Sequence, residues 1–162
     1  MKHIIRSISI AFAICMLYGS CATQKGHSAQ KASQATKVAE ALDARDFTIS
    51  IDRMIPLRSS ARNVSDYYIT VRNDSLFSSL PYIGRAYNVP YGGTNGLSFS
   101  APIGSYNESI KKNGQRNIDI KLRSSEDSYT YNIIIYDNGR SSLNVKAQQL
   151  EPISYSGELE FE

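Results

Sequence analysis

Apolar and polar residues alternate with a period of two from Phe47 to the end of the chain. Three runs carry this pattern most clearly, at residues 47–52, 67–72 and 118–123. Such alternation predicts strands with one buried and one solvent-facing side, which favours antiparallel pairing. Turn-forming clusters separate the runs: Asn73-Asp74, Gly92-Gly93, Pro102-Ile103-Gly104, Asn113-Gly114, Ser124-Ser125 and Asn138-Gly139. We therefore predict an all-β, mainly antiparallel domain over residues 46–162, a single sandwich or partly closed barrel of about seven to eight strands.

The register of one hairpin can also be predicted. A two-residue turn at Asn138-Gly139 would place Asn144 opposite Ile133, which puts a polar side chain against the core. A three-residue loop, 137–139, keeps apolar residues opposite one another, so the hydrophobic pattern selects it. The predicted pairs are Tyr129 with Ala147, Tyr131 with Val145, Asn132 with Asn144 and Ile133 with Leu143. This loop requires Gly139 in the left-handed region, as part of a G1 bulge.

The N-terminus has the pattern of a secretory leader that ends in a lipidation signal. Lys2 and Arg6 form a basic start, and residues 7–17 form an apolar run that is too short to span a bilayer. Small residues then precede Cys21, and the segment resembles a bacterial lipobox. We therefore predict a lipoprotein signal peptide over residues 1–20 and acylation of Cys21 with palmitate-like chains.

Between this leader and the strands the sequence has few large apolar residues. We predict a lipid-anchored flexible tether over residues 21–36 and a short helix over 37–45, in which Val38 and Leu42 share one face. This helix is either a packing cap on the β domain or the end of the tether. Cys21 is the only cysteine after the leader, so no disulfide is predicted.

The residues after Cys21 indicate where in the cell envelope the protein is located. Ala22 follows it and no acidic run comes next, which resembles lipoproteins sent to the outer membrane of Gram-negative bacteria and left facing the periplasm, with surface exposure disfavoured. The membrane is then a partner through the anchor. The formal net charge is +3, and Lys2 and Arg6 leave with the leader. No clustered basic face points to a nucleic-acid partner.

Several dense motifs carry a resemblance to a known family. They are Leu80-Pro81-Tyr82-Ile83-Gly84-Arg85-Ala86-Tyr87, Pro90-Tyr91-Gly92-Gly93, Gly96-Leu97-Ser98-Phe99 and Ile153-Ser154-Tyr155-Ser156-Gly157. Together they resemble the bacterial envelope proteins of the domain of unknown function 4251 family, over roughly residues 47–159. Leu150 stands where the resemblance leads us to expect Arg. The resemblance implies a β-rich envelope protein, and the family has no established activity.

The first of these motifs supplies the candidate site. Four of its residues and neighbours form a candidate ligand or partner surface: Tyr82, Arg85, Tyr87 and Tyr91. Tyrosine rings stack on sugars or apolar ligands, and Arg85 suits a carboxylate or phosphate. The structural alternative is that Pro81 and Gly84 shape a bend, the tyrosines fill the sheet edge, and Arg85 stacks on one of them.

The residue types present argue against most catalytic chemistry. His3 lies in the leader and His27 in the tether, so the predicted folded domain contains no histidine and no cysteine. This excludes thiol nucleophiles, Ser-His dyads and imidazole metal sites there, and we predict no cofactor and no metal site. Carboxylate chemistry remains open for Asp119, Glu126 and Asp127, although their spacing does not mark a pair.

One short motif suggests a modification. Asp74-Ser75-Leu76 resembles the Asp-Ser/Thr-apolar sites that some envelope systems O-glycosylate, which makes Ser75 a candidate. The alternative is a plain turn signal.

Taken together, the sequence predicts a lipid-anchored, periplasm-facing envelope protein with a non-catalytic binding or structural module. A second hypothesis is a binding protein for glycans, lipids or envelope precursors that uses the tyrosine-rich segment, and a third is a carboxylate-based hydrolase. A concave pocket lined by the tyrosines favours a small ligand, whereas a flat apolar patch favours a protein partner.

Overall fold

The computed structural model describes residues 24–87, 96–125 and 127–161 and consists of one helix followed by eight strands. The elements are α2 (Gln24–Asp43), β1 (Asp46–Pro56), β2 (Arg62–Arg72), β3 (Ser75–Pro81), β4 (Gly96–Ile110), β5 (Arg116–Arg123), β6 (Ser128–Ile135), β7 (Arg140–Ala147) and β8 (Ile153–Glu160). Each strand pairs antiparallel with the next, and β8 pairs with β1, which closes the sheet into a barrel. The predicted fold class is confirmed, and closure is complete.

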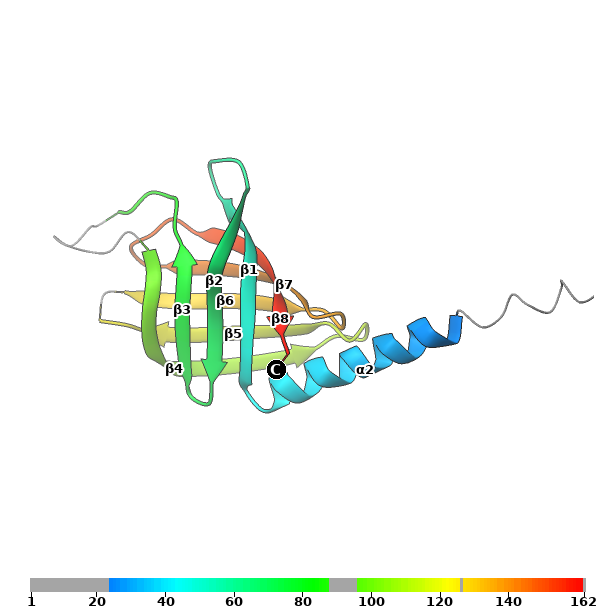
Figure 1. Ribbon diagram of the computed structural model, residues 1–162. Helices are drawn as coiled ribbons and strands as arrows, with labels where there is room; N and C mark the ends of the chain where they lie inside the picture. The colour runs from blue at the N-terminus through cyan, green and yellow to red at the C-terminus, as the bar shows by residue number, and fades with distance from the viewer. Residues whose placement is uncertain (1–23, 88–95, 126, 162) are drawn as a thin grey trace, which may run out of the picture. The chain divides into compact units, whose positions relative to one another are not determined.

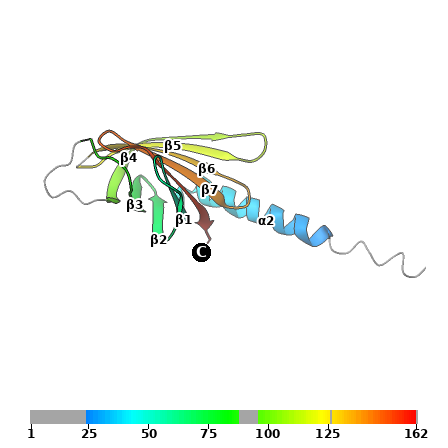
Figure 2. The same cartoon turned by 90° about the horizontal axis from the view of Figure 1, so that it is seen from above.

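Two corners bend the closed sheet into facing walls. In Figure 1, β1, β2 and β3 cross in front of β5, β6 and β7, and Figure 2 shows the two walls from above. β4 pairs with β3 through its first half and with β5 through its second, with a register shift between Ile103 and Ser105. β1 has a similar shift between Ile51 and Arg53. Bulges of this kind let a strand pass from one wall to the other.

The core fills the space between the walls. Alternate residues of β3 and of β5 to β8 point inward, and the largest fully buried side chains include Tyr131 and Tyr155. The Tyr131 hydroxyl donates to Ser78 Oγ at 3.0 Å, and Ser78 Oγ donates to the Leu97 carbonyl at 2.6 Å. Burial raises the pKa of Tyr131, so this buried hydroxyl stays protonated and serves as a donor.

The predicted hairpin register is confirmed. Tyr129 pairs with Ala147, Tyr131 with Val145, Asn132 with Asn144 and Ile133 with Leu143. Gly139 has φ +80°, and its amide donates to the Tyr136 carbonyl at 2.9 Å. One predicted turn was wrong: Pro102-Ile103-Gly104 lies inside β4, at its corner, because the shift after Ile103 continues the strand into the second wall.

The predicted tether and helix boundaries need correction. Residues 24–36, predicted as coil, are helical, and α2 ends at Asp43. Ala, Gln and Lys are good helix formers, so a segment without large apolar residues can still be helical. The chain divides into two compact units, Met1–Ser33 and Gln34–Glu162, and the second contains the whole barrel. No helix in the described parts of the chain is both long and apolar enough to cross a bilayer.

The last turns of α2 close one end of the barrel. Val38 and Leu42 are buried there, as a packing cap requires. Arg116, only 11% exposed, forms ion pairs of 2.6 Å with Asp43 of the helix and Glu108 of β4. The helix is therefore fixed to the strands by apolar contacts and by a partly buried cation shared between two carboxylates.

Candidate functional site

The antiparallel meander separates the connections into two groups. The β1–β2, β3–β4, β5–β6 and β7–β8 connections lie at one end of the barrel, which we call the loop end, and α2 lies at the other, the helix end (Figure 1). The predicted tyrosine-rich segment follows β3 and therefore belongs to the loop end.

Tyr82 has a structural role. Its hydroxyl lies 2.9 Å from the Arg85 carbonyl and 3.1 Å from the Glu151 carbonyl, and burial raises its pKa. Gly84 lies directly under this hydroxyl, and a Cβ at that position would collide with it. The Tyr82 hydroxyl is therefore used in hydrogen bonds within the protein, and Gly84 leaves room for it.

The segment after Gly84 is held by backbone hydrogen bonds to the β7–β8 connection. The Tyr87 amide donates to the Gln149 carbonyl at 2.7 Å, and the Glu151 amide donates to the Arg85 carbonyl at 2.9 Å. Ala86 and Leu150 form an antiparallel bridge between them. Leu150, the position that departs from the family resemblance, thus lies directly beside the motif.

Glu151 holds this arrangement together, although no motif in the sequence marks it as a site residue. Its side chain is 4% exposed and accepts from Arg58 Nε at 2.5 Å and from the Arg85 amide at 3.4 Å. The Arg58 hydrogen bond holds the pKa of Glu151 below its ordinary value. A charged residue between Leu150 and Pro152, directly before an apolar strand, is the sequence signal that could have identified it.

Of the other three predicted surface residues, two are exposed and one lies outside the described residues. Tyr87 is 66% exposed and Arg85 is exposed, so both can contact a ligand or partner. Among the described residues, a cation–π contact places Arg45 over the Tyr106 ring at 4.4 Å. Tyr91 lies outside the described residues. The geometry thus leaves Arg85 and Tyr87 as the described, solvent-facing members of the predicted set.

Asp119 and Asp127, the two candidate carboxylates that the structure describes, have separate partners. Asp127 accepts backbone amides from Ser128, Gln148 and Gln149, which joins the β5–β6 and β7–β8 connections. Asp119 bonds Asn132 on the outer face of the barrel, and Glu126 is outside the described residues. Glu151 has a lowered pKa, the opposite of what a general acid needs. Among the described residues no group of three or more His, Cys, Asp or Glu could hold a metal ion.

Ser75 begins β3 directly after the Asn73-Asp74 turn and is half-buried, with Arg72 and Pro102 as its ladder neighbours. Its O-glycosylation stays a prediction.

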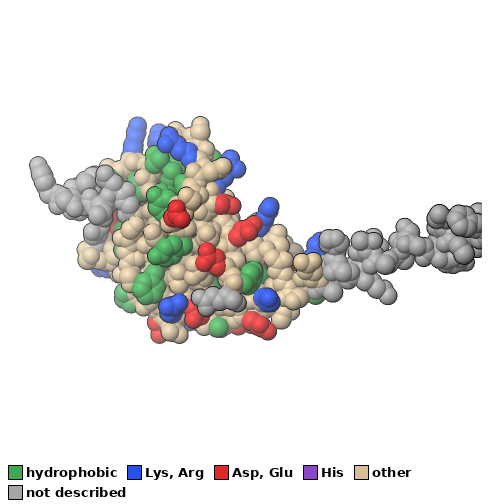
Figure 3. Space-filling model, in the orientation of Figure 1, with side chains coloured by type: hydrophobic (Ala, Val, Ile, Leu, Met, Phe, Trp, Pro, Cys, Tyr) green, Lys and Arg blue, Asp and Glu red, His purple; other side chains and the backbone are tan. Residues whose placement is uncertain are grey.

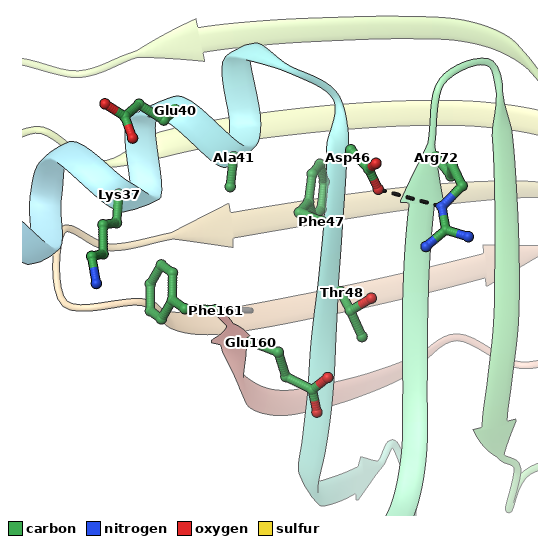
Figure 4. Close-up of a pocket in the computed structure, with 9 residues that line it drawn as sticks. All are labelled: Lys37, Glu40, Ala41, Asp46, Phe47, Thr48, Arg72, Glu160 and Phe161. Atoms are coloured by element: carbon green, nitrogen blue, oxygen red, sulfur yellow. Dashed lines mark hydrogen bonds and ion pairs between the residues drawn. The ribbon is translucent and has the colours of Figure 1, made fainter.

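The helix end carries an open cleft of about 420 Å³ (Figure 4). It lies between α2, the start of β1 and the end of β8, and Phe47 and Phe161 contribute its apolar surface. Its charged residues are Lys37, Glu40, Asp46, Arg72 and Glu160. Arg72 already faces Asp46, with Nε 3.5 Å from Oδ1. Because both charge signs line the cleft, it has no preference for a ligand of a single charge.

The fold defines the class of protein: a closed, antiparallel eight-stranded barrel with an N-terminal helix on one end. The chain matches the family model described as domain of unknown function (DUF4251) over residues 29–159, and it belongs to that family, as the motifs indicated. It is also similar to the crystal structure of a DUF4251 family protein from Bacteroides eggerthii DSM 20697. That match has a TM-score of 0.64 and 16% identity, and covers 81% of this chain and 89% of that chain. At this identity the likeness concerns the fold. No curated protein matches the chain.

The Arg58–Glu151 pair predicts a pH dependence. The pKa of Glu151 is lower in the folded protein than its ordinary value of 4.5, so its stabilisation is complete at neutral pH and is lost as the pH falls below about 4.5. Glu151→Gln removes this contribution, and its loss of melting temperature relative to wild type should therefore shrink between pH 7 and pH 3. The control Glu158→Gln alters an exposed carboxylate on β8. An equal loss of stability at both pH values would contradict the assignment.

Proposed function

We propose that this protein is a lipid-anchored, periplasm-facing envelope protein whose barrel is a non-catalytic binding or structural module. The N-terminal pattern up to Cys21 supports the anchor and the destination. The chain enters the barrel through residues 34–43 of α2, so the anchored segment joins at the helix end. The loop end is the opposite end of the barrel from residues 34–43.

One observation supports the binding role: the interior of the barrel is filled, whereas the loop end exposes side chains on a hydrogen-bonded backbone. Tyr131 and Tyr155 occupy the interior with the apolar core, so recognition falls to the outer surface. At the loop end, Tyr87 is 66% exposed while its backbone is bonded to Gln149. A contact residue on a fixed backbone loses little conformational entropy on binding. The ligand classes that suit Tyr87 and Arg85 are glycans, lipids and envelope precursors.

Acyl labelling tests the anchor. Cells that express the chain with an alkyne fatty acid should label the wild type, and Cys21→Ser should abolish the label because it removes the acylated thiol. Cys15→Ser changes the other cysteine, which lies in the predicted leader, and should keep the label. Label retained by Cys21→Ser would overturn the anchor.

Thermal unfolding tests the binding role, because a ligand that binds only the folded state raises the melting temperature. The chain from residue 22 onward should respond to one of a panel of peptidoglycan fragments, glycans, fatty acids and phospholipids. At about 100 times Kd the stabilisation is about 2.7 kcal/mol, and Tyr87→Ala should remove it. Tyr136→Ala, also exposed but next to the β6–β7 turn at the helix end, should not. A response that Tyr87→Ala leaves intact would move the site elsewhere.

A further inference from the structure

The β1–β2 hairpin exposes aliphatic side chains beside its turn. We call residues 55–62 the hairpin tip; it projects beyond the rest of the barrel at the loop end (Figure 1). Leu57 is 65% exposed and Ile55 is 40% exposed. The five residues 57–61 form the bend between the two strands. Leu57 is the first residue after β1, so the exposed aliphatic side chains lie at the start of the projecting turn.

Basic residues lie close in sequence to Ile55 and Leu57. The stretch 53–65 contains Arg53, Arg58 and Arg62 and no Asp or Glu. Figure 3 shows Lys and Arg side chains gathered at this end above hydrophobic surface. Within the described residues, no carboxylate forms an ion pair with Arg53 or Arg62. Arg58 is paired with Glu151, and Asp52 and Asp66 flank the stretch, so the positive charge on this apolar surface comes from Arg53 and Arg62.

The tip is also held in position. Arg58, the residue after Leu57, forms the 2.5 Å ion pair with the buried Glu151 on the connection to β8. This pair ties the projecting turn to the rim of the barrel. Because the ion pair holds the hairpin tip in place, the tip loses less conformational entropy when it binds.

We propose that the hairpin tip is a docking surface for the anionic headgroup layer of a phospholipid bilayer. Leu57 and Ile55 enter the interface, while Arg53 and Arg62 extend their guanidinium groups to lipid phosphates. A projecting turn with exposed aliphatic side chains beside it suits a fluid interface that closes around it, whereas a protein partner needs a matching pocket. The hairpin tip lies at the loop end, as Tyr87 does, but it is a different segment of the chain, and Leu57→Ser and Tyr87→Ala change the two segments separately.

Vesicle cosedimentation tests the proposal with the unacylated chain from residue 22 to 162, which includes every described residue and the whole barrel. Vesicles that contain phosphatidylglycerol should sediment the protein, and pure phosphatidylcholine vesicles should bind it at least about tenfold more weakly. Leu57→Ser should weaken binding to the anionic vesicles about tenfold. Arg62→Gln should weaken it about fivefold, and the effect should diminish as salt is raised.

Matched controls come from the helix end. Ile110 is 64% exposed, almost the same as Leu57, and Ile110→Ser should leave vesicle binding unchanged, as should Lys112→Gln in the β4–β5 turn. Unchanged melting temperatures show that the variants fold. Equal losses for Leu57→Ser and Ile110→Ser would overturn the proposal, as would wild-type protein that ignores anionic vesicles. A tip that cross-links to a protein partner in cells while vesicles remain unbound would also overturn it.

Discussion

Replacing Gly157 with valine is expected to destabilise the barrel by about 3 kcal/mol, because the new side chain would overlap backbone that cannot move aside. Gly157 lies opposite Ile51 on β1 and opposite Ser141 on β7. A Cβ on Gly157 would overlap the Ser50 carbonyl oxygen and come within 2.9 Å of its carbonyl carbon. This close approach occurs beside the β1 bulge, where the first and last strands join. The substitution therefore acts on the seam that closes the barrel.

Urea unfolding followed by far-UV circular dichroism measures this loss. Gly104→Ala is the matched control, because it also lies at a strand corner but its Cβ would come only to 3.2 Å from the Lys121 carbonyl oxygen. That contact is relieved by a small shift, so we expect a loss of about 1 kcal/mol or less. If Gly157→Val unfolded at the same urea concentration as Gly104→Ala, the seam would be more open than the structure describes.

Local sequence patterns predicted the strands and one hairpin, since both depend on neighbouring residues. The β6–β7 register follows from which residues are apolar on each side of Gly139, and the structure confirms it. Complete closure depends on bulges at Ile51/Arg53 and Ile103/Ser105. Alternation of polar and apolar residues assigns faces of a strand but does not say where the strand changes wall. For that reason the sequence pattern alone predicts a turn at Gly104 where the strand has a corner.

The candidate site was only partly predictable for a similar reason. The motif around Tyr82 marked the correct segment, yet its support comes from distant parts of the chain. Arg58 and Glu151 are 93 positions apart in the sequence, so no local pattern joins them. The dense aromatic content suggested four contact residues, whereas Tyr82 is used for internal hydrogen bonds and Tyr87 remains exposed. A motif identifies a segment, and the packing decides which of its side chains remain free.

Tyr155 connects the core to this segment, and its replacement by alanine is expected to cost about 3 to 5 kcal/mol of stability. Its side chain is fully buried, and its hydroxyl donates to the Pro81 carbonyl at 2.6 Å. Tyr155→Phe keeps the ring and removes only this donor, so we expect a loss of about 1 kcal/mol. The difference between the two variants separates the packing of the ring from the hydrogen bond. Chemical unfolding of both variants gives the two free energies.

The phenylalanine variant also tests how the loop end is braced. Pro81 is the last residue of β3, directly before Tyr82, so loss of its hydrogen bond should loosen the segment that presents Tyr87. Hydrogen exchange of the Tyr87 amide, which donates to the Gln149 carbonyl, should become faster in Tyr155→Phe while the Ile133 amide in the barrel core changes less. Equal acceleration at both amides would mean that the barrel and the loop end open together. In that case the exposed tyrosine would belong to the same cooperative unit as the core, and ligand binding there would stabilise the whole barrel.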